Sequence, residues 1–159
     1  MILIKTIKTM RGFKVISTID EIELKKFPIS AQTVLVGDLF ERVHGATTWT
    51  ACTAASLNYS RKFIAYEAAT SSATEVLGYE VRGNERVEAQ SSQVGSATND
   101  GDSMLLTDKN TVNNSSADTS EESCFIQDGV GLTYSGTTTT YSIFGRIAVS
   151  ASGIDPAAS

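Results

Sequence analysis

The stretch from residue 62 to residue 89 reads KFIAYEAATSSATEVLGYEVRGNERVEA, and its pattern decides the fold class. Three short runs rich in β-branched and aromatic residues, at 62–66, 75–81 and 86–89, are separated by polar segments. Gly83-Asn84 stands between the second and third runs, where a tight turn is favoured. Short apolar runs bounded by turn residues are typical of strands, so this stretch predicts three consecutive β-strands.

The same pattern continues on both sides of this stretch. Segments of similar length and character occupy residues 13–16, 19–24, 33–36, 38–43, 103–107, 124–127 and 141–149. No long window has the i, i+3, i+4, i+7 apolar spacing of an amphipathic helix. About ten short strands at this spacing predict an all-β fold, either a compact β-barrel or a β-sandwich.

Three segments fall outside the strand pattern. The Ala-rich segment 50–58 is predicted to hold one helical turn, and Gly129-Val-Gly131 is predicted to be a turn. The almost entirely polar segment 110–122 is predicted to be a long solvated loop.

Charge is distributed unevenly along the chain. Its 13 Lys and Arg and 18 Asp and Glu give a net charge of −5, which argues against a nucleic-acid partner. Residues 1–26 carry +3, residues 27–86 carry −1 and residues 87–159 carry −7. We therefore expect a basic N-terminal arm with the first strands at 1–26 and a β-barrel body at 27–159. No run of about 18 apolar residues is present, so no membrane partner is expected.

A weak internal repeat runs through the body. Gly37-Asp38 is matched by Gly101-Asp102, and Phe63-Ile64 is matched by Phe125-Ile126. Leu77-Gly78, before a short apolar run, is matched by Phe144-Gly145. These matches predict half-repeats at 27–90 and 91–150, although short matches also arise by chance in a chain so rich in Gly and Ser.

The sequence contains no catalytic motif. Its one histidine, His44, excludes any zinc site or mechanism that needs two, and no GxSxG or phosphate-binding loop is present. Cys52 and Cys124 are too few and too far apart for a disulfide framework, so they are interpreted as buried free thiols. We expect no enzyme activity, no cofactor and no metal site.

The opening segment MILIKTIKTMRGFKV alternates apolar and basic character without turn residues before Gly12. An extended segment of this kind can add a strand to a neighbour's sheet edge, or its lysines can protect an edge of its own sheet. The candidate residues for binding a partner or a neighbouring subunit are Ile2, Ile4, Lys5, Lys8, Arg11 and Lys14.

Trp49 lies in a Thr-rich stretch, Thr47-Thr48-Trp49-Thr50. A lone tryptophan in a strand fits a core residue or an interface anchor, and it also fits a platform on which a sugar stacks. Both interpretations stay open at the level of sequence.

Residues 27–43, FPISAQTVLVGDLFERV, resemble a recurring segment of the head decoration, or capsid cement, proteins of tailed bacteriophages. In that family a Pro-x-x-Ala segment leads into a strand, then Gly-Asp and a second apolar strand, as at Pro28–Ala31 and Gly37-Asp38 here. Leu77-Gly78-Tyr79-Glu80-Val81 is similar to a later strand of the same proteins. The resemblance covers about a third of the chain, and a Ser/Thr/Asn-rich insertion at 107–123 departs from it.

The resemblance implies a structural virion protein that binds the outer surface of a phage capsid. Its implied partners are the major capsid protein and further copies of itself, as a homotrimer that clamps neighbouring capsid subunits. The opening segment has no signal-peptide pattern, which fits synthesis in the host cytoplasm followed by assembly on the capsid exterior.

Two other binding functions remain alternatives. A phage tail or fibre component would read a host receptor through Trp49 and the 107–123 loop. A carbohydrate-binding β module would need several aromatic side chains on one face, whereas aromatic residues here are dispersed.

Overall fold

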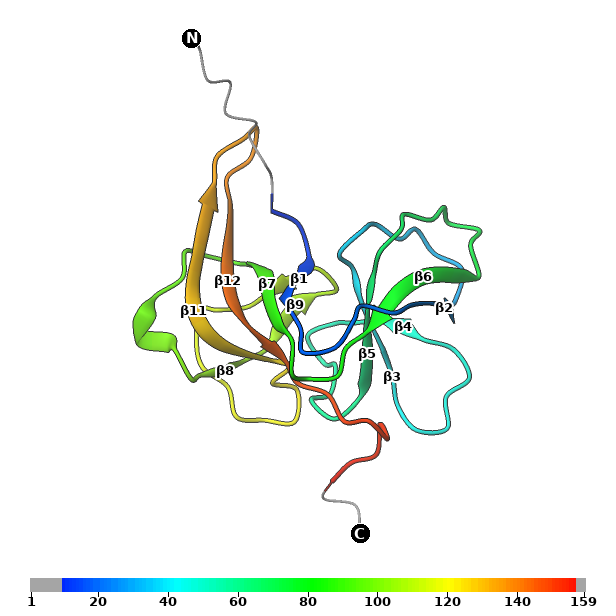
Figure 1. The fold of residues 1–159 in the computed structure, drawn as a ribbon. Helices are drawn as coiled ribbons and strands as arrows, with labels where there is room; N and C mark the ends of the chain where they lie inside the picture. Colours follow the sequence, from blue (N-terminus) through cyan, green and yellow to red (C-terminus); the bar gives the residue numbers. More distant parts are fainter. Residues whose placement is uncertain (1–9, 157–159) are drawn as a thin grey trace.

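The structure, a computed structural model, describes residues 10–156 of the chain. Within this range, regular structure consists of twelve β-strands and one short 3-10 helix, Ala97–Asn99. The strands form two sheets, which make up the two halves of the molecule (Figure 1). The all-β fold class predicted from the sequence is confirmed.

The first sheet is formed by the first half of the chain. In spatial order its strands are β2 (Leu24–Pro28), β6 (Glu75–Glu80), β5 (Arg61–Ala65), β3 (Leu39–Arg42) and β4 (Thr50–Ala51). Neighbouring strands pair antiparallel. A parallel bridge joins Ile29, directly after β2, to Trp49, directly before β4. This bridge closes the sheet into a small ring, which we call the first barrel.

The second sheet has seven strands and is also nearly closed. Its main path is β8 (Ser103–Met104), β11 (Phe125–Tyr134), β12 (Thr140–Ile147), β7 (Arg86–Ser91), β10 (Thr111–Val112) and β9 (Leu106–Asp108). Only Leu105 separates β8 from β9 in the chain, so the two ends of this path meet. β1 (Phe13–Ser17) lies off the path and pairs antiparallel with β7. We call this sheet the second barrel.

The two barrels are built from strands that pair and connect in corresponding ways. Phe63 of β5 pairs with Phe40 of β3, and Phe125 of β11 pairs with Met104 of β8. Both barrels also connect four antiparallel strands in the same way, with the first strand in the chain beside the fourth, as in a Greek key. In the first barrel these strands are β2, β3, β5 and β6, and in the second they are β7, β8, β11 and β12.

A matching glycine turn precedes β3 and β8. Gly37 and Gly101 each have a φ of +92°, a conformation that residues with a Cβ rarely adopt. The N–H of Gly37 donates to the carbonyl of Ala65 at 2.9 Å, and that of Gly101 donates to the carbonyl of Gln127 at 2.8 Å. The two turns are therefore built alike. The half-repeat ranges 27–90 and 91–150 themselves stay a prediction.

The first barrel has an aromatic core. The Phe63 ring stacks between Phe27 and Phe40, with ring centroids 4.1 and 4.9 Å away. Trp49 meets Phe63 edge-on at 5.2 Å and is only 2% exposed. Such aromatic pairs add about 1 kcal/mol each to the stabilisation from burial alone.

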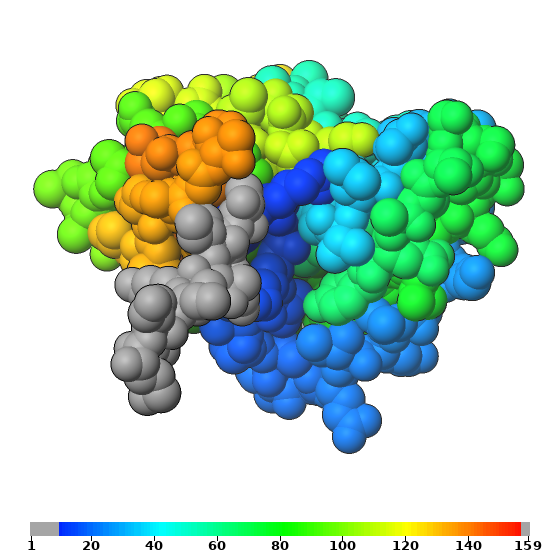
Figure 2. All heavy atoms as spheres, turned by 90° about the horizontal axis from the view of Figure 1, so that it is seen from above, coloured from blue at the N-terminus to red at the C-terminus, as the bar shows by residue number. Residues whose placement is uncertain are grey.

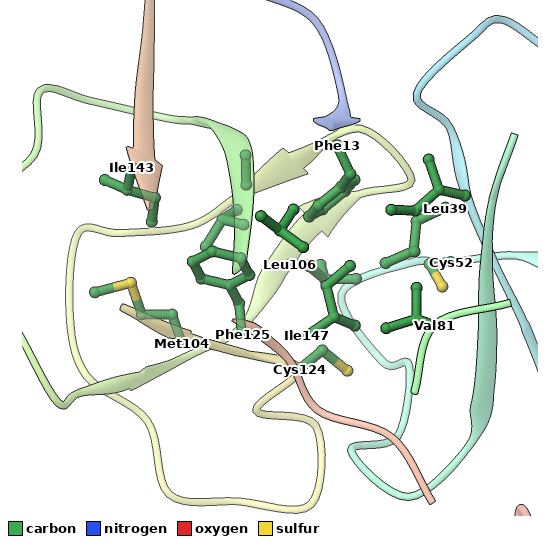
Figure 3. Close-up of a cluster of buried hydrophobic side chains, with 14 of the residues drawn as sticks. Phe13, Leu39, Cys52, Val81, Met104, Leu106, Cys124, Phe125, Ile143 and Ile147 are labelled. Atoms are coloured by element: carbon green, nitrogen blue, oxygen red, sulfur yellow. The ribbon is translucent and has the colours of Figure 1, made fainter. Parts of the chain in front are cut away.

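A second core fills the other barrel and the junction between the two (Figure 3). Phe125 and Ile143 belong to the second barrel, whereas Leu39 belongs to the first. Along β5 successive side chains point to opposite faces, so Phe63 enters the first core and Ile64 enters the second. The first barrel is thus packed both inside and on the side that faces its neighbour.

Two of the predicted strands lie elsewhere or are absent. No strand forms at 19–23, and the strand in this region is β2, which begins at Leu24. Ile19 and Ile22 are 84% and 45% exposed, so they are not core residues. Residues 33–36 form no strand, and Val34 makes only an isolated bridge to Ala69.

The three predicted non-strand segments also differ in part. Residues 50–58 contain no helical turn and begin with β4. Gly129 and Gly131 lie inside β11, where two register shifts relative to β12 accommodate them. The predicted loop at 110–122 begins with β10, whose Val112 is fully buried, and is mostly exposed after Asn114.

Candidate functional site

The base of the N-terminal segment is fixed to the first barrel by an ion pair. Nη2 of Arg11 lies 2.7 Å from Oδ1 of Asp38, and Nη1 donates to the carbonyl of Val36 at 3.0 Å. The Asp38 side chain is fully buried and also lies 3.3 Å from Nζ of Lys109. A buried carboxylate needs such partners, because an unpaired buried charge is strongly unfavourable.

Gly12 brings the segment into direct backbone contact with this turn. The N–H of the next residue, Phe13, donates to the carbonyl of Gly37 at 2.9 Å. A Cβ on Gly12 would collide with that same carbonyl group, and its φ of +69° also favours glycine. The chain therefore crosses the first barrel at one defined point before it enters β1 of the second.

A groove runs beside this crossing, between the two barrels. Its volume is about 530 Å³, and its lining is mainly apolar, including Val15, Ile22, Val36 and Tyr66. Met10 and Arg11 also line it, so the described chain begins at its wall. In Figure 2 the segment after Met10, in dark blue, lies in the seam between the half with the orange hairpin and the half in cyan and green.

An acidic side chain stands in the groove wall. Glu88 of β7 is 6% exposed, and its Oε2 accepts hydrogen bonds from Tyr134 Oη at 2.6 Å and Ser142 Oγ at 2.7 Å. Glu88 thus places a nearly buried acidic group in the wall of a largely apolar groove.

The sequence-predicted arm residues fall into two sets. Ile2, Ile4, Lys5 and Lys8 lie outside the described residues. Arg11 and Lys14 are described: Arg11 pairs within its own chain with Asp38, and Lys14 is an exposed residue of β1 opposite Glu88.

The predicted interface anchor Trp49 lies in the first core. Its ring packs against Phe27 at 5.0 Å, and the guanidinium groups of Arg42 and Arg61 lie 5.9 and 5.3 Å from it. At 2% exposure it offers almost no surface to a ligand in this chain. The core interpretation accounts for its position.

The groups weighed for catalysis lie apart from the groove. His44 is exposed on the loop after β3, and its backbone N–H donates to Gly153. Cys52 and Cys124 are buried free thiols. Burial raises the pKa of Cys124 to about 11 and that of Cys52 well above its usual value. Both side chains therefore stay in the thiol form at neutral pH and are not activated as nucleophiles. Among residues 10–156, no cluster of His, Cys, Asp and Glu could hold a metal ion.

Sequence reasoning missed Asp38 and Glu88 as site residues. Asp38 was noted only as half of a Gly-Asp pair, and the one signal for its burial is its place between the apolar residues 34–36 and 39–40. Glu88 sits among inward-facing residues of β7, and nothing local distinguishes it from a solvated acid.

Comparisons with family models, curated proteins and solved structures give no match to this chain. Within the described range, no helix has the length and apolar character needed to cross a membrane.

Proposed function

We propose that this protein is a structural virion protein that binds the exterior of a phage capsid and stabilises it, with its N-terminal segment contacting neighbouring subunits. The observation that carries the proposal is the fixed base of this segment. Arg11, Gly12 and Phe13 are held on the Leu35–Asp38 turn by an ion pair and a backbone hydrogen bond. A basic and apolar stretch, residues 1–9, precedes that fixed point.

The body has properties that suit a clamp. Its core is continuous across the junction between the barrels, so a load applied at the base of the segment is shared by both sheets. A protein that binds the assembled shell and not its free subunits stabilises the shell by mass action. Several copies acting together would add effective concentration, so modest contacts at each copy suffice.

The experiment adds purified protein to undecorated phage heads and measures occupancy by sedimentation. The wild type is compared with a variant that lacks residues 1–9. This deletion stops before Arg11, because removal of residues 11–14 would also break the contacts with Asp38 and Gly37. We expect the wild type to saturate the heads and to raise their resistance to heating, and the deletion to reduce occupancy at least tenfold.

Absence of binding by the intact protein to any undecorated head would refute a capsid function. A glycan array run on the same preparation tests the alternative, a tail, fibre or carbohydrate-binding module. Specific binding of a glycan would favour that alternative, whereas head binding without glycan binding supports the cement function.

A further inference from the structure

We infer that the groove between the barrels is the receptor for residues 1–9 of a second copy of this chain, which bind along the free edge of β1. This inference rests on the part of the proposed function that gives the N-terminal segment a protein partner. It names the surface that receives the segment and the residues that line it.

The groove offers a strand edge. Among the described strands, β1 pairs with β7 alone, so its opposite edge is not part of a ladder. The N–H of Phe13 donates to the carbonyl of Gly37. Ile16 and Ser17, at the other end of β1, are exposed. An extended segment can add to such an edge, with main-chain hydrogen bonds supplying much of the affinity.

The walls of the groove match the segment in chemistry. Val15, Ile22, Val36 and Tyr66 give it apolar walls, and Ile22 and Val36 are 45% and 55% exposed when it is empty. Residues 1–4 are all apolar, and Ile7 follows between two lysines. Burial of such apolar surface is worth about 25 cal/mol per Å², which favours occupation of the groove.

Charge contributes little to the choice of occupant. Of the charged residues that line the groove, Arg11 and Lys14 are basic, and the acid, Glu88, is 6% exposed and already accepts two hydrogen bonds. The groove therefore selects its occupant through apolar contacts and main-chain hydrogen bonds.

The occupant comes from a second copy because the segment is poorly suited to turning back. Residues 1–10 contain no Gly, Pro, Asn, Asp or Ser, the residues that favour tight turns. The N–H of Met10 donates to Thr140 Oγ1 at 3.2 Å, at the start of β12, and Arg11 is held by Asp38. To pair with the free edge of β1 in the same molecule, the chain would have to reverse direction at these two fixed residues. Extended, nine residues span about 30 Å, enough to reach a neighbouring molecule.

The first test uses a labelled peptide of residues 1–10 and the variant that lacks residues 1–9. We expect saturable binding in a fluorescence-anisotropy titration. Ile22→Lys, on the groove wall, should weaken binding at least tenfold. Leu132→Lys is the matched control, because Leu132 is 57% exposed, lies outside the groove and receives the same added charge. Equal affinities in the two variants, or no binding to any variant, would overturn the groove as receptor.

The second test shows which copy supplies the segment. One preparation carries Ile4→Cys and another carries Val36→Cys, and the two are mixed and oxidised. We expect disulfide-linked heterodimers in the mixture, in higher yield than the disulfide-linked homodimers that either variant forms alone. A double variant that closes only within one chain, with no heterodimer in the mixture, would refute exchange between copies. Because no capsid is present in either test, their failure would leave capsid binding itself to be judged by the head assay.

Discussion

Gly145 of β12 lies against the ring of Phe125 in β11, and Gly78 of β6 lies against Phe63 of β5 in the same way. A Cβ added to Gly145 would be 2.7 Å from Phe125 Cε1, and one added to Gly78 would be 2.6 Å from Phe63 Cδ2. In each barrel the glycine pairs with the residue two positions after the phenylalanine. Both cores thus depend on the same arrangement, in which a large ring occupies the space that a neighbouring side chain would need.

The substitution Gly145→Ala is expected to lower the free energy of unfolding by about 3 kcal/mol. Its Cβ would collide with the carbonyl oxygen of Ile126, a backbone atom that cannot move without distorting the strand pair. Urea titration followed by circular dichroism measures the change. Thr133→Ala, at an exposed position of the same hairpin, should change stability by less than about 0.5 kcal/mol. Similar losses in both variants would argue against a packing role for the glycine.

The substitution Arg11→Met is expected to cost about 2 kcal/mol of stability, because it removes one cation from the buried carboxylate of Asp38. Lys109, 3.3 Å away, limits the loss. Lys26→Met is the control, since Lys26 and Glu75 form an exposed pair at 3.9 Å that should contribute almost nothing. Thermal unfolding of both variants gives the comparison, and an unchanged midpoint for Arg11→Met would show that Asp38 is satisfied without it.

Of the tyrosines with a raised pKa, Tyr79 and Tyr134 should lose their phenol protons at the highest pH. Burial raises the pKa of Tyr79 to about 12, with a further contribution from its hydrogen bond to Glu85. Burial and the hydrogen bond to Glu88 raise the pKa of Tyr134 to about 12 in the same way. Absorbance at about 295 nm should therefore show fewer ionised tyrosines at pH 11 in the folded protein than after unfolding in urea.

These tyrosines also give stability a pH dependence. Below about pH 10 both states keep the phenol proton, so the stabilisation from the neutral form is fully present. Between about pH 10 and 12 the unfolded state releases protons that the folded state retains, so stability falls as pH rises. The double variant Tyr79→Phe/Tyr134→Phe should flatten this decline, measured by urea midpoints at several pH values. An equally steep decline would assign it to other groups.

The two thiols should be unreactive in the folded protein. Cys52 and Cys124 are 2% and 0% exposed, and burial raises the pKa of both. At pH 8 Ellman's reagent is expected to modify both rapidly in guanidinium chloride and neither at a comparable rate under native conditions. Rapid native modification of either thiol would mean that the junction between the barrels opens readily.

The sequence was most informative where side chains alternate between two buried environments. The strands at 61–65, 75–80 and 86–91 follow the predicted runs closely, because β-branched and aromatic residues there fill two cores. Ile19 and Ile22 misled the prediction, since an apolar residue shows its type in the sequence but not whether a core lies beside it. Whether an apolar side chain is buried or exposed was decided by tertiary packing.

The candidate site was only partly predictable. The basic and apolar pattern of the N-terminal segment predicts that Arg11 and Lys14 bind a partner. The residue that pairs with Arg11 is Asp38, which lies 27 residues away along the chain. The contact depends on the path of β1 between the barrels, which no local pattern encodes. The groove has the same origin: it is formed by residues from β1, the Ile22 region, the Val36 turn and β7, which meet only after folding.

The pairing of β1 with β7 sets the order in which a growing chain can fold. Residues 13–17 leave the ribosome before the other described strands, but their partner strand begins at Arg86. All the strands of the first barrel, from Leu24 to Glu80, lie between them. The first barrel can therefore close around its aromatic core during synthesis, while the earliest strand of the chain still waits for its partner. The first of the described strands is placed only after the first barrel has been made, and before the remaining strands of the second barrel.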